Sequence, residues 1–373
     1  MAQSFCIHSR KLMDFIEENF NGISAPFNAG IELTTKCNLN CVHCYAKHDK
    51  YKDITTEEFK QVFDELVDRG LLEVYLTGGE IFLRRDFEEL FVYAKKKGVL
   101  VVLLSNITML SQKHIDLFSE YPVELISTTM YGYSEETYER VTQVKGSYRR
   151  FMNGLDLIRK NGIELELKFI GMKQNIEDLY KVREFGRQLG VDMVVSLDIH
   201  PTRSGSLEPM DYRLPPRVSY EFDVTDEGRR EFWKAVARDL VSGEIGVRPQ
   251  YAKARFEQGY LYPCSVAHQF VFISSDYQMQ GCGRATYRKF DLRKGTFDEG
   301  WQYLKEQLKD KKASPDFKCM GCNIIRFCEQ CNANFAQAYG DEEQVDPYYC
   351  ELAALRKSFV DEEIKLLLSG SGG

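Results

Sequence analysis

Residues 30–48 read GIELTTKCNLNCVHCYAKH, an apolar run followed at once by a cysteine-rich loop. Cys37, Cys41 and Cys44 have the spacing C-x3-C-x2-C, which supplies three ligands. Three thiolates can hold three irons of a cubane and leave the fourth iron open to another ligand. A zinc knuckle is the alternative, but it needs a fourth Cys or His at finger-like spacing, and His43 is too close to Cys44 for that geometry. The loop therefore favours an iron–sulfur cluster.

The apolar run before this loop is the first of six that alternate with amphipathic stretches between about residue 30 and residue 200. Six strand–helix units in a row predict a parallel sheet with right-handed crossovers. Periodicity alone leaves open whether the sheet is doubly wound or curved into an incomplete barrel. The predicted strands are Gly30–Thr35, Leu72–Thr77, Val99–Ser105, Val123–Met130, Ile163–Ile170 and Asp192–Ile199, and the predicted helices are Thr55–Arg69, Asp86–Lys97, Ser111–Ser119, Ser147–Lys160 and Ile176–Leu189.

A second motif, Gly78-Gly79-Glu80, follows the second predicted strand. Two glycines let the backbone approach closely, and a carboxylate can pair with an ammonium group. Alone the motif is no more than a turn, but parallel α/β folds bind ligands at the carboxyl ends of their strands. Together with the cysteine triplet, it resembles the radical S-adenosylmethionine (radical SAM) family.

The resemblance implies a partial (β/α)6 TIM-like barrel within an α/β fold, with S-adenosylmethionine as cofactor. The open iron would chelate the cofactor's amino and carboxylate groups, and one electron from the cluster would cleave it to a 5′-deoxyadenosyl radical. His43 would pack near the adenine, and Gly78-Gly79-Glu80 would bind the amino group, although Ile81 replaces the usual proline.

Further cofactor contacts are implied after the third and fourth strands. Ser105 and Asn106 stand where relatives carry a polar pair that touches the ribose, and the match places Thr129 and Arg140 against the cofactor. A capped strand end and a surface helix charge are the alternatives for Thr129 and Arg140.

Seven cysteines form a second group with the dense core CMGCNIIRFCEQC. The gap between its two pairs is too short for a zinc ribbon, whereas such clustering suits iron–sulfur cubanes. The region resembles the SPASM domain of peptide-modifying radical enzymes, although the last gap of the core is one residue short and Tyr277 replaces a turn glycine. The resemblance implies two auxiliary 4Fe–4S clusters, a distal one on Cys319, Cys322, Cys328 and Cys350 and a proximal one on Cys264, Cys282 and Cys331.

The predicted organisation has five parts, an N-terminal extension (1–29), the radical SAM partial barrel (30–215), a bridging region (216–258), the SPASM domain (259–351) and a C-terminal helix with a flexible tail (352–373). A loop over 201–216, helices near Glu227–Leu240 and Glu351–Leu367, and a hairpin over Gln269–Gly281 complete the expectation. Only 29 residues precede the first predicted strand, so a leader-recognition domain is expected to be a separate small protein, or the barrel surface takes that role.

Composition narrows the class of protein. The 373 residues carry a net charge of −7, so nucleic acid is not an expected partner, and no apolar run is long enough to cross a bilayer. There is no secretory signal, and ten of the eleven cysteines fall in spaced groups, which predicts a cytoplasmic, oxygen-sensitive metalloprotein. Cys6 stands outside both groups and is either inert, a hydrogen-atom donor or a ligand.

The resemblances to the radical SAM family and to the SPASM domain imply an oxidoreductase that matures a ribosomally made peptide, with flavodoxin or ferredoxin as electron donor. A thioether is the favoured product, because a peptide cysteine could bind the open iron of the proximal cluster; carbon–carbon, carbon–oxygen and backbone-excision products need the same radical step. A sulfatase-maturase role is disfavoured, because Gly283 rather than Asp follows Cys282. Oxidation of a carbohydrate or a tetrapyrrole, and an electron carrier without radical chemistry, remain as alternatives.

Overall fold

Strand β1 (Asn28–Thr34) is buried at every position and pairs in parallel with a strand on each side. The computed structural model describes residues 20, 22–47, 53–191, 193–243 and 258–370. In these residues one nine-stranded sheet has the order β6-β5-β4-β3-β2-β1-β7-β8-β9. The remaining parallel strands are β2 (Glu73–Gly78), β3 (Leu100–Leu104), β4 (Leu125–Thr129), β5 (Leu165–Ile170), β6 (Met193–Ser196) and β7 (Phe270–Ile273), and the antiparallel ones are β8 (Gln278–Gln280) and β9 (Lys289–Asp291).

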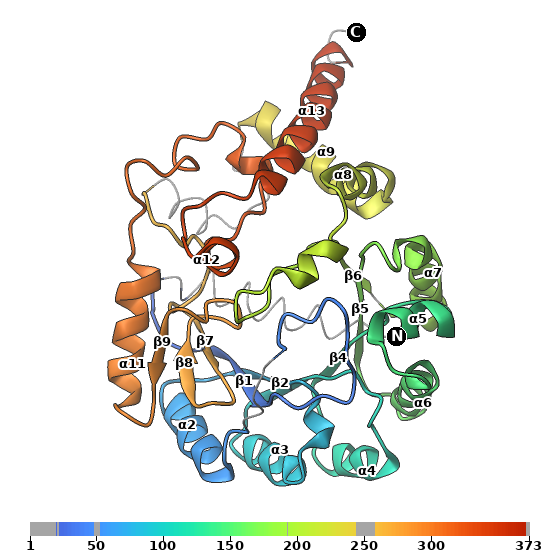
Figure 1. Cartoon of the computed structure of the whole chain (residues 1–373), viewed down its shortest axis with the longest axis vertical. Helices are drawn as coiled ribbons and strands as arrows, with labels where there is room; N and C mark the ends of the chain where they lie inside the picture. Colours follow the sequence, from blue (N-terminus) through green and yellow to red (C-terminus); the bar gives the residue numbers. More distant parts are fainter. Residues whose placement is uncertain (1–19, 21, 48–52, 192, 244–257, 371–373) are drawn as a thin grey trace. The chain divides into compact units, whose positions relative to one another are not determined.

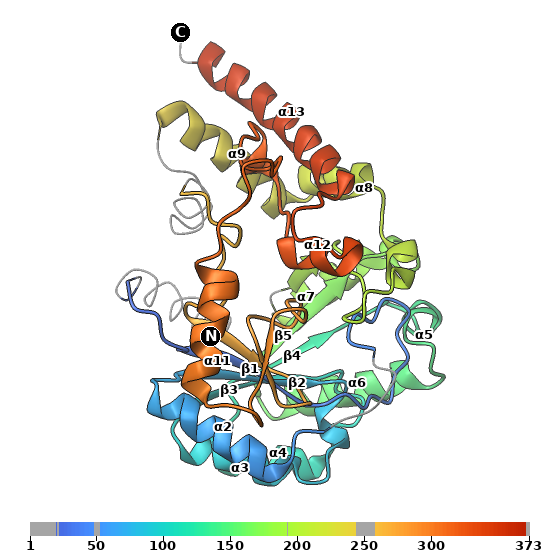
Figure 2. The same ribbon diagram turned by 60° about the vertical axis from the view of Figure 1, so that its left-hand side comes forward.

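The crossover helices follow one another along the outer face of the curved sheet (Figures 1 and 2). A doubly wound sheet would carry helices on both faces, so the incomplete barrel is the correct choice of the two predicted arrangements. Helix α2 shows why these segments are helical, since Thr55 and Glu58 form a reciprocal capping box and four apolar residues share its buried face. The helices are α2 (Thr56–Asp68), α3 (Phe87–Lys96), α4 (Gln112–Glu120), α5 (Glu135–Thr142), α6 (Ser147–Lys160) and α7 (Leu179–Leu189).

Contacts divide the described chain into two compact units, which we treat separately. The first contains the residues up to Arg213 together with Ser265–Lys309, and therefore the whole sheet and helix α11 (Phe297–Leu304). The predicted hairpin is confirmed as β7–β8, and β7 extends the sheet beside β1. The two units are defined by contacts within the chain, whereas the predicted domains were defined by their cysteine groups. The predicted domain limits therefore stay a prediction.

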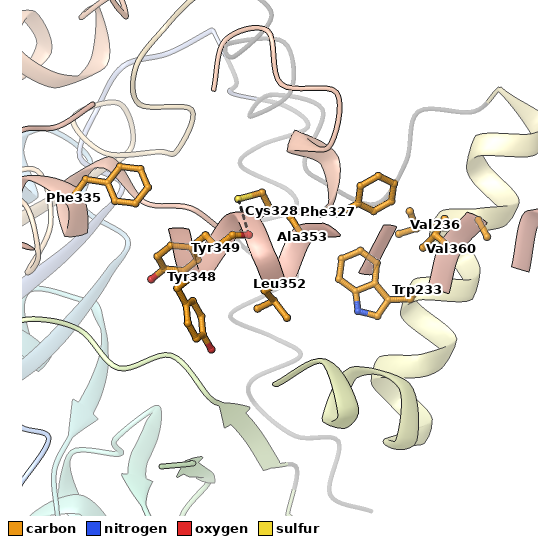
Figure 3. Close-up of a cluster of buried hydrophobic side chains, with 11 residues drawn as sticks. Trp233, Val236, Phe327, Cys328, Phe335, Tyr348, Tyr349, Leu352, Ala353 and Val360 are labelled. Carbon is orange, nitrogen blue, oxygen red and sulfur yellow. Dashed lines mark hydrogen bonds between the residues drawn. The ribbon is translucent and has the colours of Figure 1, made fainter. Parts of the chain in front are cut away.

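The second unit, Leu214–Cys264 and Asp310–Gly373, is helical. Its helices are α8 (Pro216–Thr225), α9 (Glu227–Ser242), α12 (Asn332–Tyr339) and α13 (Pro347–Gly370). Figure 3 shows their shared core, in which Trp233 and Val236 of α9 meet Leu352, Ala353 and Val360 of α13. No helix in the described ranges is long and apolar enough to span a membrane.

Candidate functional site

The first cysteine loop leaves the carboxyl end of β1 and is fixed by backbone hydrogen bonds on two sides. The amides of Asn40 and Val42 donate to the carbonyls of Thr142 and Val141 at the end of α5, both at 3.0 Å. On the other side, the amides of Gly79 and Glu80 donate to Thr34 and Lys36, both at 2.8 Å. The loop thus rests between the end of α5 and the glycine motif that follows β2.

The two glycines are required by close packing against this loop. A Cβ on Gly79 would lie 2.2 Å from the carbonyl oxygen of Lys36 and 2.9 Å from the Cβ of Cys37, and a Cβ on Gly78 would lie 2.5 Å from the carbonyl oxygen of Thr34. Such distances leave no room for any side chain, and the obstruction is backbone that cannot rotate away. Gly78-Gly79 therefore forms the seat of the cysteine loop.

Glu80 is fully buried and links the end of β2 to the end of β3. Its carboxylate accepts hydrogen bonds from the Ser105 hydroxyl (2.8 Å) and from the amides of Asn106 (2.8 Å) and Phe82 (3.1 Å). The oxygens thus bind groups of the protein itself, which makes Glu80 an organiser of the next loop. The predicted contact of Glu80 with a ligand's amino group stays a prediction.

Burial raises the pKa of Glu80 from its ordinary value of 4.5 to about 7, although its three hydrogen bonds act in the opposite direction. Between pH 4.5 and pH 7 the Glu80 carboxyl is therefore protonated in the folded chain and ionised in the unfolded chain. We expect the unfolding free energy of iron-free protein to fall by about 3 kcal/mol as pH rises from 4.5 to above 7. Urea unfolding at pH 5 and pH 7.5 measures this change, and Glu80→Gln should remove this part of the slope. An equal slope in the variant would contradict the assignment.

Asn106 connects the loop after β3 to the cysteine loop. Its amide nitrogen donates to the Cys37 sulfur at 3.7 Å and to the Asn38 side-chain oxygen at 3.1 Å, while Asn38 donates to Thr108 at 2.8 Å. The predicted residues Ser105 and Asn106 therefore lie beside the first predicted ligand, at the carboxyl edge of the sheet.

Buried aromatic rings pack against the same loop. The rings of His43 and Tyr131 are 5.1 Å apart, and those of Tyr131 and Tyr138 are 5.8 Å apart. Burial lowers the pKa of His43 to about 4, so the ring is neutral at ordinary pH. Within the described chain, Nδ1 of His43 and the hydroxyl of Tyr138 are buried without a hydrogen-bond partner. These two polar atoms beside the cysteine loop are available to hydrogen-bond a bound polar group.

The three thiols are close enough to influence one another. Desolvation raises the pKa of Cys37 to about 11, and Glu80 and Cys44 add to the shift. Desolvation, Cys44 and Cys37 raise the pKa of Cys41 still further, and desolvation also raises that of Cys44. Without metal these groups are neutral thiols, whereas a coordinating metal ion deprotonates them.

The donor set fits a cluster better than one zinc ion. In the part of the chain that is described, no three His, Cys, Asp or Glu side chains converge closely enough for a single ion. The thiolates of a cubane bind separate irons and stand further apart. The thiols, the glycine seat and the orphaned polar atoms thus fit an iron–sulfur cluster with a polar cofactor beside it.

Thr129 and Arg140 differ in their surroundings. Thr129 ends β4, and its side chain hydrogen-bonds Tyr131, which places it near the cysteine loop. Arg140 lies on the exposed face of α5, where it pairs with Glu177 and donates to the Gln174 carbonyl at 2.9 Å. Arg140 thus has the surroundings of a surface charge, and its predicted contact with a cofactor stays a prediction.

Four cysteines of the second group lie close together in the helical unit. Burial, Cys328, Cys350 and Cys322 raise the pKa of Cys319 to about 12. These are the four residues predicted for the distal cluster. Cys331 precedes α12, and Cys264 and Cys282 belong to different units, so the proximal set stays a prediction. Cys6 lies outside the described residues.

An ion-pair network centred on a buried arginine holds the segment that carries Cys328. Arg356 of α13 donates to Asp223 at 2.6 Å, to Glu329 at 2.9 Å and to the Phe327 carbonyl at 3.3 Å. The Arg356 side chain is 3% exposed and that of Asp223 is 2% exposed. The network thus fixes the residues on both sides of Cys328.

Removal of this guanidinium should destabilise the helical unit. Arg229 still pairs with Asp223 at 2.7 Å after this loss, so the carboxylate keeps one cation. We therefore expect Arg356→Met to lower the unfolding free energy by about 2 kcal/mol, as for lost hydrogen bonds to a charged group. Arg217→Gln is the matched control, since Arg217 is 78% exposed and forms a long ion pair of 3.9 Å with Glu221. Denaturant unfolding followed by far-ultraviolet circular dichroism measures both, because Arg356 lies 5.0 Å from the Trp233 ring and its replacement would itself alter tryptophan fluorescence. Equal stability of the two variants would show that the network is not needed.

Sequence reasoning missed Tyr131, Tyr138, Asn38 and the ion pair of Glu32 with Arg203. Arg203 follows β6, and its guanidinium reaches Glu32 of β1. A charged residue inside an otherwise apolar strand is the one available signal, because such a residue needs a partner.

Comparison with known proteins gives a family match over the part of the chain that contains the first cysteine loop and Gly78-Gly79-Glu80. Residues 31–186 match the family model described as "Radical SAM superfamily". The AdoMet-dependent heme synthase of Methanosarcina barkeri is 25% identical over 340 residues, which cover 87% of this chain and 96% of that protein. The subtilosin biosynthesis protein AlbA of Bacillus subtilis is 28% identical over 46% of this chain and 39% of that protein. Streptococcus suis SuiB bound to the precursor peptide SuiA has a TM-score of 0.65 and 15% identity, over 92% of this chain and 80% of that one.

Proposed function

We propose that this chain, which belongs to the radical SAM superfamily through residues 31–186, installs an oxidative cross-link in a ribosomally made peptide. Members of the superfamily are enzymes, so the chain is not a simple electron carrier. The superfamily implies S-adenosylmethionine and one 4Fe–4S cluster as cofactors. Their reductive reaction supplies a radical that abstracts a hydrogen atom.

The residues that would hold these groups lie at the carboxyl ends of β1 to β4. Cys37, Cys41 and Cys44 are the cluster ligands, and Gly78-Gly79 keeps their loop in place. Asn106 donates toward the Cys37 sulfur, and hydrogen bonds to cluster sulfurs influence the reduction potential. Ser105, Asn106 and Thr129 would contact the cofactor, with His43 near its adenine.

The observation that carries the proposal is that Cys319 lies within electrostatic reach of Cys322, Cys328 and Cys350. Formation of a thioether removes two hydrogen atoms from the peptide, one by abstraction and the other as a proton and an electron. A redox group must accept that electron, and four neighbouring thiols are the donor set of an auxiliary iron–sulfur cluster. A second auxiliary cluster on Cys264, Cys282 and Cys331 would leave an iron for the peptide's own sulfur.

A peptide substrate is supported by relatives from different sources. AlbA is named for subtilosin biosynthesis, a PqqA peptide cyclase of Ruegeria pomeroyi is 29% identical over 171 residues, and SuiB has been solved with its precursor peptide. We propose the same substrate class here, with a thioether as the favoured bond and with flavodoxin or ferredoxin as electron donor. A separate small protein would recognise the leader.

A tetrapyrrole is the second candidate substrate. The heme synthase of Methanosarcina barkeri matches this chain over 96% of its own length, whereas the match to AlbA covers 39% of that protein. A match over the whole length includes the region that would surround the substrate, whereas the match to AlbA includes a smaller part of that protein, so the longer match favours this alternative.

One experiment separates the two candidates. Anaerobically reconstituted protein is incubated with S-adenosylmethionine, dithionite and one of two substrates. The first is a synthetic cysteine-containing precursor peptide encoded beside the gene, and the second is Fe-coproporphyrin III, the porphyrin in the name of another Methanosarcina barkeri relative, which is 31% identical over 150 residues. The proposal expects 5′-deoxyadenosine together with a loss of two hydrogen masses from the peptide. A mass change confined to the porphyrin supports the second candidate, and absence of 5′-deoxyadenosine from every mixture overturns both.

A further inference from the structure

Arg203 is a buried cation in the loop after β6 that none of the predicted roles includes. Its side chain is 7% exposed, and its guanidinium pairs with Glu32 of β1, which is 2% exposed. The same guanidinium donates through Nε to the carbonyl oxygen of Gly283 at 3.0 Å. Gly283 directly follows Cys282, so this side chain joins β1 to a segment that carries a predicted cluster ligand.

The backbone of Arg203 makes two further contacts. Its amide donates to the carbonyl oxygen of Tyr45 at 2.8 Å, and its carbonyl oxygen accepts from the Thr286 hydroxyl at 3.2 Å. Tyr45 directly follows Cys44, and its ring lies 5.4 Å from the guanidinium. One residue therefore contacts the immediate neighbours of a cysteine from each of the two groups.

The geometry suits an arginine and no other cation. The guanidinium reaches Glu32 and Gly283 with separate nitrogens and lies 5.3 Å from the ring of Phe272. The second oxygen of Glu32 accepts from the amide (3.1 Å) and hydroxyl (2.9 Å) of Ser275. Lysine has a single nitrogen and cannot serve a carboxylate and a carbonyl in a fixed fork. Because the ion pair of Arg203 and Glu32 has no net charge, its main effect is to fix the positions of the segments that it joins.

We propose that Arg203 is a positioning residue that locks the loop ending at Cys44 to the segment carrying Cys282, so that both cysteines are set in place together. The inference depends on the proposed function only in that Cys282 is taken as a cluster ligand. The fork to Glu32 and Gly283 also fixes the Arg203 backbone, which hydrogen-bonds Tyr45 and Thr286. Loss of the fork should therefore let this backbone shift, loosen both segments and lower iron retention.

The test uses the full chain, reconstituted under anaerobic conditions, with the variant Arg203→Lys. Hydrogen–deuterium exchange is followed at Cys44 and Ala285, whose amides donate to Cys41 and Cys282, both at 3.1 Å. We expect exchange about fivefold to tenfold faster at both amides, as for the loss of one hydrogen bond, and a lower iron content per chain.

Arg293→Lys is the matched control. Arg293 also ties the β7–β8 turn to a distant element, with hydrogen bonds to Glu58 at 2.7 Å and to the Asp276 carbonyl at 2.6 Å, but it is 46% exposed. Exchange at Cys44 and Ala285 should be unchanged in this control. If Arg203→Lys does not fold, the double variant Glu32→Gln/Arg203→Gln removes both buried charges and is read in the same way.

The outcomes are separable. Unchanged exchange at both amides in a folded Arg203 variant overturns the proposal, and so does acceleration at only one of them. Cys282→Ala with the iron content of the unaltered chain would refute the assignment of Cys282 to a cluster, and with it the proposed binding of the peptide's sulfur there, while the exchange result for Arg203 would still stand or fall by itself.

Discussion

Replacement of Cys37, Cys41 and Cys44 by alanine is expected to reduce the formation of 5′-deoxyadenosine to the level of a mixture without protein. We propose these thiols as the ligands of the radical cluster, because they lie within residues 31–186, the segment that matches the radical SAM superfamily. The measurement is chromatography of anaerobic mixtures containing S-adenosylmethionine and dithionite, with iron determined in the same samples.

Cys350→Ala is the control that separates the two cysteine groups. Cys350 interacts with Cys319 and Cys322 in the helical unit, so its loss should remove a distal cluster and leave cofactor cleavage in place. We expect 5′-deoxyadenosine without modified peptide from this variant. If the triple alanine variant still cleaves the cofactor, the C-x3-C-x2-C loop is not the radical site.

Most helices and strands of the barrel were predictable because each has a local sequence pattern. Runs such as Val99–Ser105 and capped amphipathic stretches such as Thr55–Arg69 are confirmed as β3 and α2. A helix around Arg140 was considered only as the alternative for that residue and without bounds, because α5 has only eight residues and two of its four buried positions are threonines. The predicted loop over 201–216 contains a short 3-10 helix, Glu208–Tyr212, and gives way to α8 at Pro216, where a proline at the first turn is a usual start signal.

The pairing of segments that are distant along the chain could not be predicted from the sequence. The hairpin of β7 and β8 has a local signal, but nothing in the hairpin indicates that β7 pairs with β1. In the same way, motifs reveal the cysteines and Gly78-Gly79-Glu80, whereas Glu32 and Arg203 meet across 171 positions. The aromatic packing of His43 on Tyr131 is also non-local. Periodicity reports which face of an element is buried and carries no information about its partner.

Gly79→Ala is expected to remove the radical cluster without altering any ligand. The added Cβ would lie 2.2 Å from the carbonyl oxygen of Lys36 and 2.5 Å from its carbonyl carbon, so the backbone that leads into Cys37 must move. The hydrogen bonds that seat this loop, from Gly79 to Thr34 and from Glu80 to Lys36, would break with that movement. Overpacking of this kind costs about 3 kcal/mol.

The variant therefore tests whether the glycine seat, and not only the thiols, makes the site. We expect iron content to fall by one cluster and 5′-deoxyadenosine to fall to background, while the iron held by the second cysteine group is retained. Gly228→Ala is the control, because its Cβ would meet nothing nearer than 3.6 Å at Asp226, within the helical unit. A Gly79→Ala chain that keeps its full iron and cleaves the cofactor normally would mean that the loop can shift at little cost. In that case its position would be set by the Asn40 and Val42 hydrogen bonds to α5 alone.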